Sequence, residues 1–264
     1  MKNIRIDYYT GTGGSELIAR LLADKLKINN CNVEINRIFR ANINGVMELD
    51  TDYYILIFPV HSFCAPKPVY EWVEHLSGNC CTTAVISVSG GGNVLSNTAC
   101  RCKTVKLLKK SNCNVIYEDM VRMPNNWMKA PEPKKCTRIL SLLPNKIDEI
   151  AQTVVSQKTA KKIIYWIDYL ISALGEAEKK YTQKFGNGIK VLDTCTGCGI
   201  CAKNCCSSNI QKEKMPKFGD QCDMCLGCVY NCPQKALQPT YGAFQVDKNG
   251  YDLRMMRQRP THSL

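Results

Sequence analysis

Eight cysteines in the last third of the sequence recur in two runs with one spacing. In each run two residues separate the first three cysteines and three residues precede the fourth: Cys195, Cys198, Cys201 and Cys205, then Cys222, Cys225, Cys228 and Cys232. Three thiolates at this spacing can wrap one 4Fe-4S cubane, while the fourth reaches the other cluster. The repeat predicts two interlocked ligand sets: Cys195, Cys198, Cys201 and Cys232 for cluster one, and Cys222, Cys225, Cys228 and Cys205 for cluster two.

A pair of zinc knuckles is the alternative for these cysteines, because C-x-x-C pairs also bind zinc. Zinc would leave the third cysteine of each run without a role, so the spacing favours iron-sulfur clusters. On this spacing, residues 189–240 resemble bacterial two-cluster ferredoxins. One departure is Cys206, which stands where that family usually has proline. It could be an alternative ligand, a redox-sensitive thiol or, as we favour, a small apolar side chain; without proline, cluster two could be more labile.

A segment rich in glycine and hydroxyl groups follows the first predicted strand and opens the first predicted helix. Its residues are Thr10, Gly11, Thr12, Gly13, Gly14 and Ser15. Such a turn presents backbone N–H groups at a helix N-terminus, where a phosphate is favoured without lysine or arginine. The segment matches neither a Walker loop nor a full G-x-G-x-x-G fingerprint. The predicted ligand is therefore a mononucleotide.

This segment has the T-x-T-G-x-S form of the flavodoxin phosphate loop, and the first 165 or so residues resemble flavodoxins. The resemblance implies FMN, bound at the carboxyl ends of the strands. It also implies that two further loops flank the flavin ring: Pro59, Val60, His61, Ser62 and Phe63 after the third strand, and Ser89, Gly90, Gly91, Gly92 and Asn93 after the fourth. Phe63 or His61 could stack on the ring and Trp127 could cover it, or His61 could be a surface residue and Trp127 a core residue.

The elements that must position these residues alternate along the first half of the chain. Strand patterns occur at 4–8, 33–39, 53–58, 84–88 and from 115 to about 123, with helical patterns at 17–26 and 69–76. We therefore predict an α/β fold with a five-stranded doubly wound parallel sheet and a small C-terminal α+β domain. Residues 145–181 have helical periodicity and are predicted as one long bridging helix. The predicted domains are 1–185 and 186–264.

The composition of the chain indicates its cellular compartment and the class of its partners. The chain has 264 residues and 17 cysteines but opens without a signal-peptide pattern, so we expect a cytoplasmic protein with reduced or metal-bound thiols. No stretch predicts a membrane span. The formal charge of +12 is spread along the chain without a nucleic-acid motif, and bound clusters and a phosphate would remove about six positive charges. We therefore predict no nucleic-acid partner, although a basic docking face for a redox protein is compatible with the charge.

The other cysteines lack regular ligand spacing, so we predict no third metal site from them. They are Cys31, Cys64, Cys80, Cys81, Cys100, Cys102, Cys113 and Cys136. Among these, Cys64 is the exception, because it sits in the predicted flavin loop after the third strand.

The combined pattern resembles fused flavodoxin-ferredoxin proteins of anaerobes over nearly the whole chain. The resemblance implies a cofactor set of FMN and two 4Fe-4S clusters, and an intramolecular relay that passes electrons to a redox partner protein. An alternative is an FMN-dependent reductase of a small substrate, for which His61 is the candidate proton donor. A further alternative is a cluster-based redox sensor whose N-terminal domain binds no flavin.

Overall fold

The computed structural model describes residues 1–92, 95–126, 133–161, 165–178, 181–240 and 253. Its largest feature is a parallel sheet of five strands: β1 (Lys2–Tyr8), β2 (Cys31–Arg37), β4 (Tyr53–Pro59), β6 (Thr82–Ser89) and β7 (Asn114–Arg122). The spatial order is β2-β1-β4-β6-β7. Counted along the chain, this is the 2-1-3-4-5 order of flavodoxin-like folds. The predicted fold class is confirmed.

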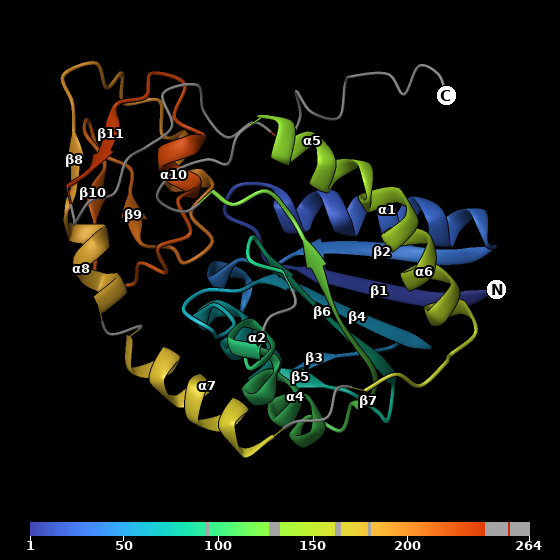
Figure 1. Ribbon diagram of the computed structural model, residues 1–264. Helices are drawn as coiled ribbons and strands as arrows, with labels where there is room; N and C mark the ends of the chain where they lie inside the picture. The colour runs from blue at the N-terminus through green and yellow to red at the C-terminus, as the bar shows by residue number, and fades with distance from the viewer. Residues whose placement is uncertain (93–94, 127–132, 162–164, 179–180, 241–252, 254–264) are drawn as a thin grey trace.

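Helices cover both faces of the sheet and bury two apolar cores (Figure 1). On one face, α1 (Gly14–Ile28) packs beside α6 (Leu143–Val155), with α5 (Pro133–Ser141) next to α6. On the other face lie α2 (Lys67–Glu74) and α4 (Arg101–Lys110), and α7 (Trp166–Glu178) contacts both α4 and the short α3 (Leu95–Thr98). Every residue of β4 from Tyr53 to Phe58 is buried, as expected of a strand covered on both faces.

The single long helix predicted over 145–181 is wrong. α6 ends at Val155, Gln157 has a left-handed φ of 50°, and α7 begins only at Trp166. Between the two helices, Ala160 donates a backbone hydrogen bond to Ile116 (3.0 Å) and accepts one from Glu118 (3.0 Å). The chain leaves the helix there because β7 is an edge strand whose backbone groups require partners, and helical periodicity does not report that demand.

The structure also corrects the predicted ends of one strand and one helix. Phe39 lies outside β2, next to the 3-10 turn η1 (Arg40–Asn42). The helix predicted to reach residue 76 ends at Glu74, because Leu76 starts the two-residue strand β5 (Leu76–Ser77), which pairs with β3 (Met47–Glu48).

The cysteine-rich part forms a small α+β unit built from short elements. β8 (Ile189–Val191) pairs with β11 (Leu237–Pro239), and β9 (Ile210–Gln211) pairs with β10 (Lys217–Phe218). Three short helices complete the unit: α8 (Thr182–Asn187), α9 (Ile200–Lys203) and α10 (Gly227–Tyr230). Phe185 packs in its core, so α8 crosses the domain boundary predicted after residue 185.

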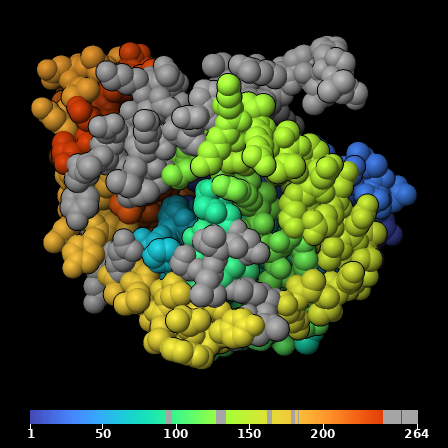
Figure 2. Space-filling model, in the orientation of Figure 1, coloured from blue at the N-terminus to red at the C-terminus, as the bar shows by residue number. Residues whose placement is uncertain are grey.

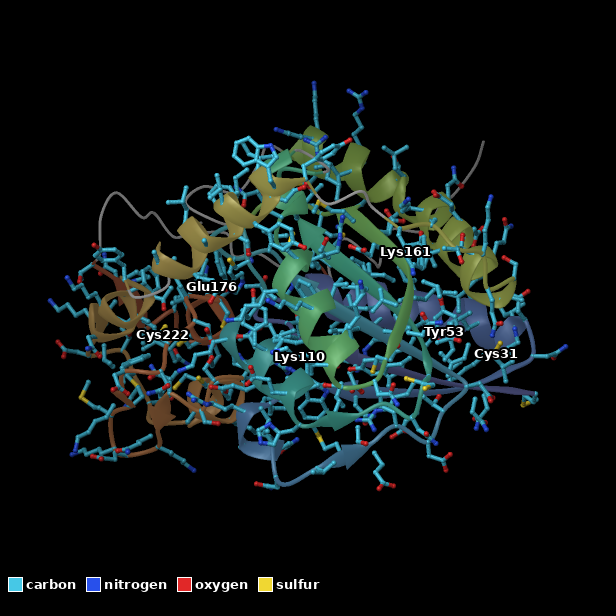
Figure 3. The ribbon with its side chains drawn as sticks, turned by 90° about the horizontal axis from the view of Figure 1, so that it is seen from below. Cys31, Tyr53, Lys110, Lys161, Glu176 and Cys222 are labelled. Atoms are coloured by element: carbon cyan, nitrogen blue, oxygen red, sulfur yellow. The ribbon has the colours of Figure 1, made fainter. Side chains whose placement is uncertain are left out.

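The cysteine-rich unit lies beside the carboxyl ends of the sheet strands (Figure 1). Its orange atoms pack directly against blue-green atoms of the sheet domain (Figure 2). Figure 3 shows Cys222 toward one end of the molecule and Cys31 and Tyr53, which begin β2 and β4, toward the other. The two sets of predicted cofactor residues therefore meet at one end of the sheet.

Among the helices of the described ranges, none combines the length and the apolar character that crossing a bilayer would require.

Candidate functional site

The predicted phosphate loop connects β1 to α1 and leads straight into the helix N-terminus. Gly13 is the N-cap of α1 and has a φ of 96°, a backbone conformation that residues other than glycine rarely adopt. Its N–H donates to Thr10 Oγ1 (2.9 Å), which holds the turn. Ser15 is 2% exposed, and its Oγ has no hydrogen-bond partner within the described residues. A buried, unpartnered hydroxyl beside free helix N–H groups fits a phosphate ligand.

A cavity of about 400 Å³ opens at this end of the sheet. Its volume lies within the roughly 300–1,000 Å³ range of cofactor pockets. The residues from the three predicted loops that line it are Thr10, Gly11, Thr12, Gly14 and Ser15; Pro59, Val60, His61, Ser62 and Phe63; and Ser89, Gly90 and Gly91. The structure thus brings the three loops around one space. Gly13 and Gly92 do not line it, and Asn93 and Trp127 lie outside the described residues.

The loop after β4 is a tight turn with an exposed aromatic side chain. His61 and Cys64 exchange backbone hydrogen bonds of 2.9 and 2.8 Å, while Ser62 and Phe63 have left-handed φ values of 46° and 58°. A bulky residue rarely adopts that conformation, and such strain concentrates at ligand-binding positions. Phe63 is 38% exposed and lines the cavity, as a ring-stacking residue would. His61 is half-buried and also lines it.

Helix α7 supports this turn from behind. A Cβ on Gly175 would stand 2.0 Å from the carbonyl oxygen of Ser62, so only glycine allows the helix to approach so closely. Cys64 is buried and its Sγ donates to the carbonyl oxygen of Ser172 (3.2 Å). The Cys64 thiol therefore supports the loop and is absent from the cavity lining.

Sequence reasoning missed part of the cavity wall that follows β6 and β7. Asn97 donates through Nδ2 to Ser89 Oγ (2.8 Å) and to the carbonyl oxygen of Gly92 (3.0 Å), which fixes the glycine loop. The cavity is also lined by Met123, Pro124, Asn125 and Asn126, directly after β7. Their place at a strand carboxyl end was the available signal, because ligands of doubly wound sheets bind there.

The largest omission is the part of the wall to which the second cysteine run contributes Asp223, Met224, Cys225 and Leu226. The backbones of the two regions touch. A Cβ on Gly11 would lie 2.2 Å from the carbonyl oxygen of Cys225, and one on Gly227 would lie 2.8 Å from the carbonyl oxygen of Gly11. Glycine at both positions permits this contact. The phosphate loop and the second cysteine run therefore form one continuous site.

Polar contacts hold the second unit in this position. The backbone N–H of Lys67, at the start of α2, donates to Asp223 Oδ1 (3.2 Å). The N–H of Arg40 donates to the carbonyl oxygen of Cys206 (2.8 Å), and the Tyr230 hydroxyl donates to the carbonyl oxygen of Asn126 (3.1 Å). Each bond joins a residue of the sheet domain to a residue near the cysteines.

The first predicted ligand set surrounds a second cavity, whose lining includes Cys195, Cys198, Cys201 and Cys232. Three of these come from the first run and one from the second, as the interlocked arrangement requires. The structure therefore brings these four side chains together, and their binding to iron stays a prediction.

The second predicted set gathers around Cys205. The pKa of Cys222 is raised to about 12, chiefly by burial and in smaller part by the nearby Asp223 and Cys205. Burial also raises the pKa of Cys225 and of Cys228, and Cys205 is among the charges that act on each thiol. The fourth cysteine of the first run thus lies among the first three of the second run.

The sulfur atoms receive backbone hydrogen bonds of a kind that cluster thiolates accept. The N–H groups of Asn209, Met224 and Ala236 point to Cys205, Cys222 and Cys232 Sγ, each at 3.3 Å. Across the described part of the chain, no group of three or more His, Cys, Asp or Glu side chains converges on a position for a single metal ion. In a 4Fe-4S cubane each thiolate binds a different iron, so its ligands do not converge in that way.

Cys206 is fully buried between the phosphate loop and the second ligand set. Its Sγ donates to the carbonyl oxygen of Thr10 (3.2 Å), and the Arg37 guanidinium lies 3.3 Å from the same sulfur. Cys206 belongs to the apolar core that also contains Tyr9. The burial fits the favoured interpretation of Cys206 as a small apolar side chain, whereas the Arg37 contact fits the alternative of a redox-sensitive thiol.

The remaining thiols are dispersed through the sheet domain. Cys80 is exposed and the others are buried; the sulfurs of Cys81 and Cys113 lie 3.9 Å apart.

Comparisons with known proteins match the sheet domain. No family model and no curated protein matches the chain. Among solved structures, a Fusobacterium nucleatum flavodoxin mutant bound to flavin mononucleotide is 17% identical, with a TM-score of 0.42, covering 61% of this chain and 98% of that chain. The flavodoxin of Streptococcus pneumoniae TIGR4 is 15% identical, with a TM-score of 0.41, covering 59% and 99%. A short-chain flavodoxin associated with a bacterial microcompartment is 14% identical, with a TM-score of 0.42, covering 60% and 100%. The fold assignment itself rests on the strand order.

Proposed function

We propose that this protein is an electron carrier that binds FMN in the cavity of about 400 Å³ and two 4Fe-4S clusters in the cysteine-rich unit. The observation that carries the proposal is the composition of that cavity. The phosphate loop lines one part of it, and Cys225, a predicted ligand of cluster two, lines another. A flavin in this space would lie directly against a cluster ligand.

Residues of the cavity would bind FMN and shield its ring from water. Ser15 and the N-terminus of α1 would receive the FMN phosphate. The turn at Phe63 and the loop from Ser89 to Gly91 would flank the ring and exclude water from it. When bound, a flavin exchanges electrons singly or in pairs whereas a 4Fe-4S cluster exchanges them singly, so the pair of cofactors can split or collect electron pairs.

The two ligand sets differ in their distance from this cavity. Cluster two would lie next to the flavin, because Cys225 lines the flavin cavity. Cluster one would lie farther along the unit, and one of its predicted ligands, Cys198, is exposed. We therefore assign cluster two as the neighbour of the flavin and cluster one as the exchange point with a redox partner protein. We place this relay in the cytoplasm, where thiols stay reduced.

Anaerobic purification and cofactor analysis test the proposal. We expect one FMN and eight iron atoms per chain, the iron following from two 4Fe-4S clusters. We also expect that the reduced protein is rapidly re-oxidised by an added ferredoxin. Full cluster occupancy without flavin would refute the relay and favour the cluster-based sensor. Turnover of a small quinone without any protein acceptor would favour the reductase, with His61 as the residue to mutate first.

A further inference from the structure

The two cysteine runs share an uncommon backbone conformation. In each run, the residues immediately before and after the second cysteine have left-handed φ angles. In the first run these residues are glycines, Gly197 at 67° and Gly199 at 75°. In the second run they are Met224 at 54° and Leu226 at 61°. The backbone repeats while the side chains do not.

Glycine suits this conformation and larger residues do not, because their Cβ crowds the neighbouring carbonyl oxygen. The first run also has no room for a side chain, since a Cβ on Gly197 would lie 2.8 Å from the carbonyl oxygen of Lys214. In the second run, by contrast, both side chains border the cavity of the sheet domain. The second run therefore carries strained, bulky apolar residues at the place where it faces that cavity.

Core packing accounts for one of these side chains. Leu226 is 3% exposed and packs in the core of the cysteine-rich unit with Phe185 and Val229. Met224 is only partly buried at the edge of that core. Packing inside the unit therefore explains Leu226 better than it explains Met224.

We propose that Met224 is a flavin-binding residue, supplied by the second cysteine run to the FMN site of the sheet domain. The proposal rests on the proposed function. The loop from Ser89 to Gly91 offers the cavity no large apolar side chain, and Met224 lines the same cavity. A methionine suits this position because its flexible, polarisable thioether makes favourable contacts with aromatic rings. The flavin site is then shared between the two units, and the strain at Met224 serves the ligand.

FMN titration of the full, cluster-loaded chain tests this assignment. Met224→Gly keeps the backbone conformation and removes the side chain, so the iron and sulfide content should stay that of the parent. We expect the FMN dissociation constant to rise about tenfold, equivalent to about 1.4 kcal/mol, and Met224→Leu to restore most of the affinity. The reduction potential of bound FMN should also shift in Met224→Gly, because water gains access to the ring.

Ser208→Gly is the matched control. Ser208 also has a left-handed φ, of 53°, but is exposed and does not line the cavity, so this variant should bind FMN as the parent does. Met224→Asn is a second test variant, because asparagine tolerates the left-handed region. Unchanged FMN affinity in a cluster-loaded Met224 variant would overturn the inference, and so would loss of clusters in both Met224→Gly and Met224→Asn. If the parent chain binds no FMN at all, the proposed function itself fails.

Discussion

The sheet domain and the cysteine-rich unit depend on different sources of stability. In the sheet domain, strands of seven to nine residues are covered by helices on both faces, and two large apolar cores are buried. In the described part of the cysteine-rich unit the strands have two or three residues, and the core cluster contains five buried apolar residues: Phe185, Ile189, Leu226, Val229 and Leu237. A core this small supplies little stability of its own. We therefore expect the sheet domain to fold without FMN, whereas the cysteine-rich unit would depend on the proposed clusters.

Removing the clusters should give the largest effect. We expect chelation of the iron under air to abolish hydrogen-exchange protection across residues 189–239, because ligand binding supplies the free energy that folds such a unit. Protection in β1, β4 and β6 should persist. Equal loss of protection in both units would contradict the comparison, and so would full protection of the cysteine-rich unit without iron.

The contact between the two units can be broken from the side of the phosphate loop. Gly11→Val adds a side chain at a position where even a Cβ would lie 2.2 Å from the carbonyl oxygen of Cys225. Because backbone cannot move away cheaply, we expect a loss of about 1–3 kcal/mol in the free energy of docking, and weaker FMN binding. Differential hydrogen exchange at residues 223–227 would report the separation.

Gly14→Ala is the control for this variant, because among the described residues its Cβ would meet only a Leu253 carbon, at 3.9 Å. It should leave the docking of the two units unchanged. If Gly11→Val behaves like Gly14→Ala, the close approach of the two units is wrong.

Ser15→Ala separates ligand binding from stability within the sheet domain. The buried Ser15 hydroxyl has no partner in the described part of the chain, so its removal should leave the apo protein equally stable or slightly more stable. The FMN dissociation constant should rise about tenfold, about 1.4 kcal/mol, through the loss of one hydrogen bond to a charged group. Denaturant unfolding with and without FMN measures both values. A destabilised apo protein with unchanged FMN affinity would show that Ser15 has a purely structural role.

The smallest expected effect is the pH dependence of stability that comes from Lys146 of helix α6. Burial lowers the pKa of Lys146, but hydrogen bonds to Asp119 and Glu149 outweigh it and leave the pKa raised. Because the pKa of Lys146 is higher in the folded protein than in the unfolded chain, its ion pair stabilises the fold fully at pH values below the ordinary lysine pKa. This contribution to the free energy of unfolding disappears as the pH rises through the higher pKa of the folded state. We expect this contribution to be about 0.5 kcal/mol, because the side chain is 28% exposed.

Stability curves of the parent and of Lys146→Met should therefore differ at neutral pH and converge in the alkaline range. The cysteine-rich unit should be unaffected throughout. A difference that grows as the pH rises would have the wrong sign for this ion pair.

Local patterns in the sequence predicted much of the fold and of the site. The buried run at 53–58 and the glycine-rich segment after β1 identify a strand and a phosphate loop because each depends on neighbours in sequence. Cysteine spacing likewise predicts which thiols meet, and the structure gathers Cys195, Cys198, Cys201 and Cys232 around one cavity.

Features that depend on distant partners could not be predicted in this way. Helical periodicity continues past Val155, but the edge strand β7 draws residues near Ala160 into an extended segment. Nothing in the local sequence pairs Gly11 with Gly227, although their contact puts Cys225 into the cavity wall. The sequence shows that glycines flank Cys198 whereas Met224 and Leu226 flank Cys225, but only the lining of the cavity suggests a role for Met224.

Flash reduction of the fully loaded protein tests the central claim most directly. A short light pulse on an added photosensitiser with a sacrificial electron donor delivers a single electron to the protein, and absorbance follows the clusters and the flavin in time. If FMN lies against cluster two within one chain, electron exchange between them should proceed at a rate independent of protein concentration, and Gly11→Val should slow it. A rate proportional to protein concentration, or clusters that never exchange electrons with the flavin, would contradict the shared site.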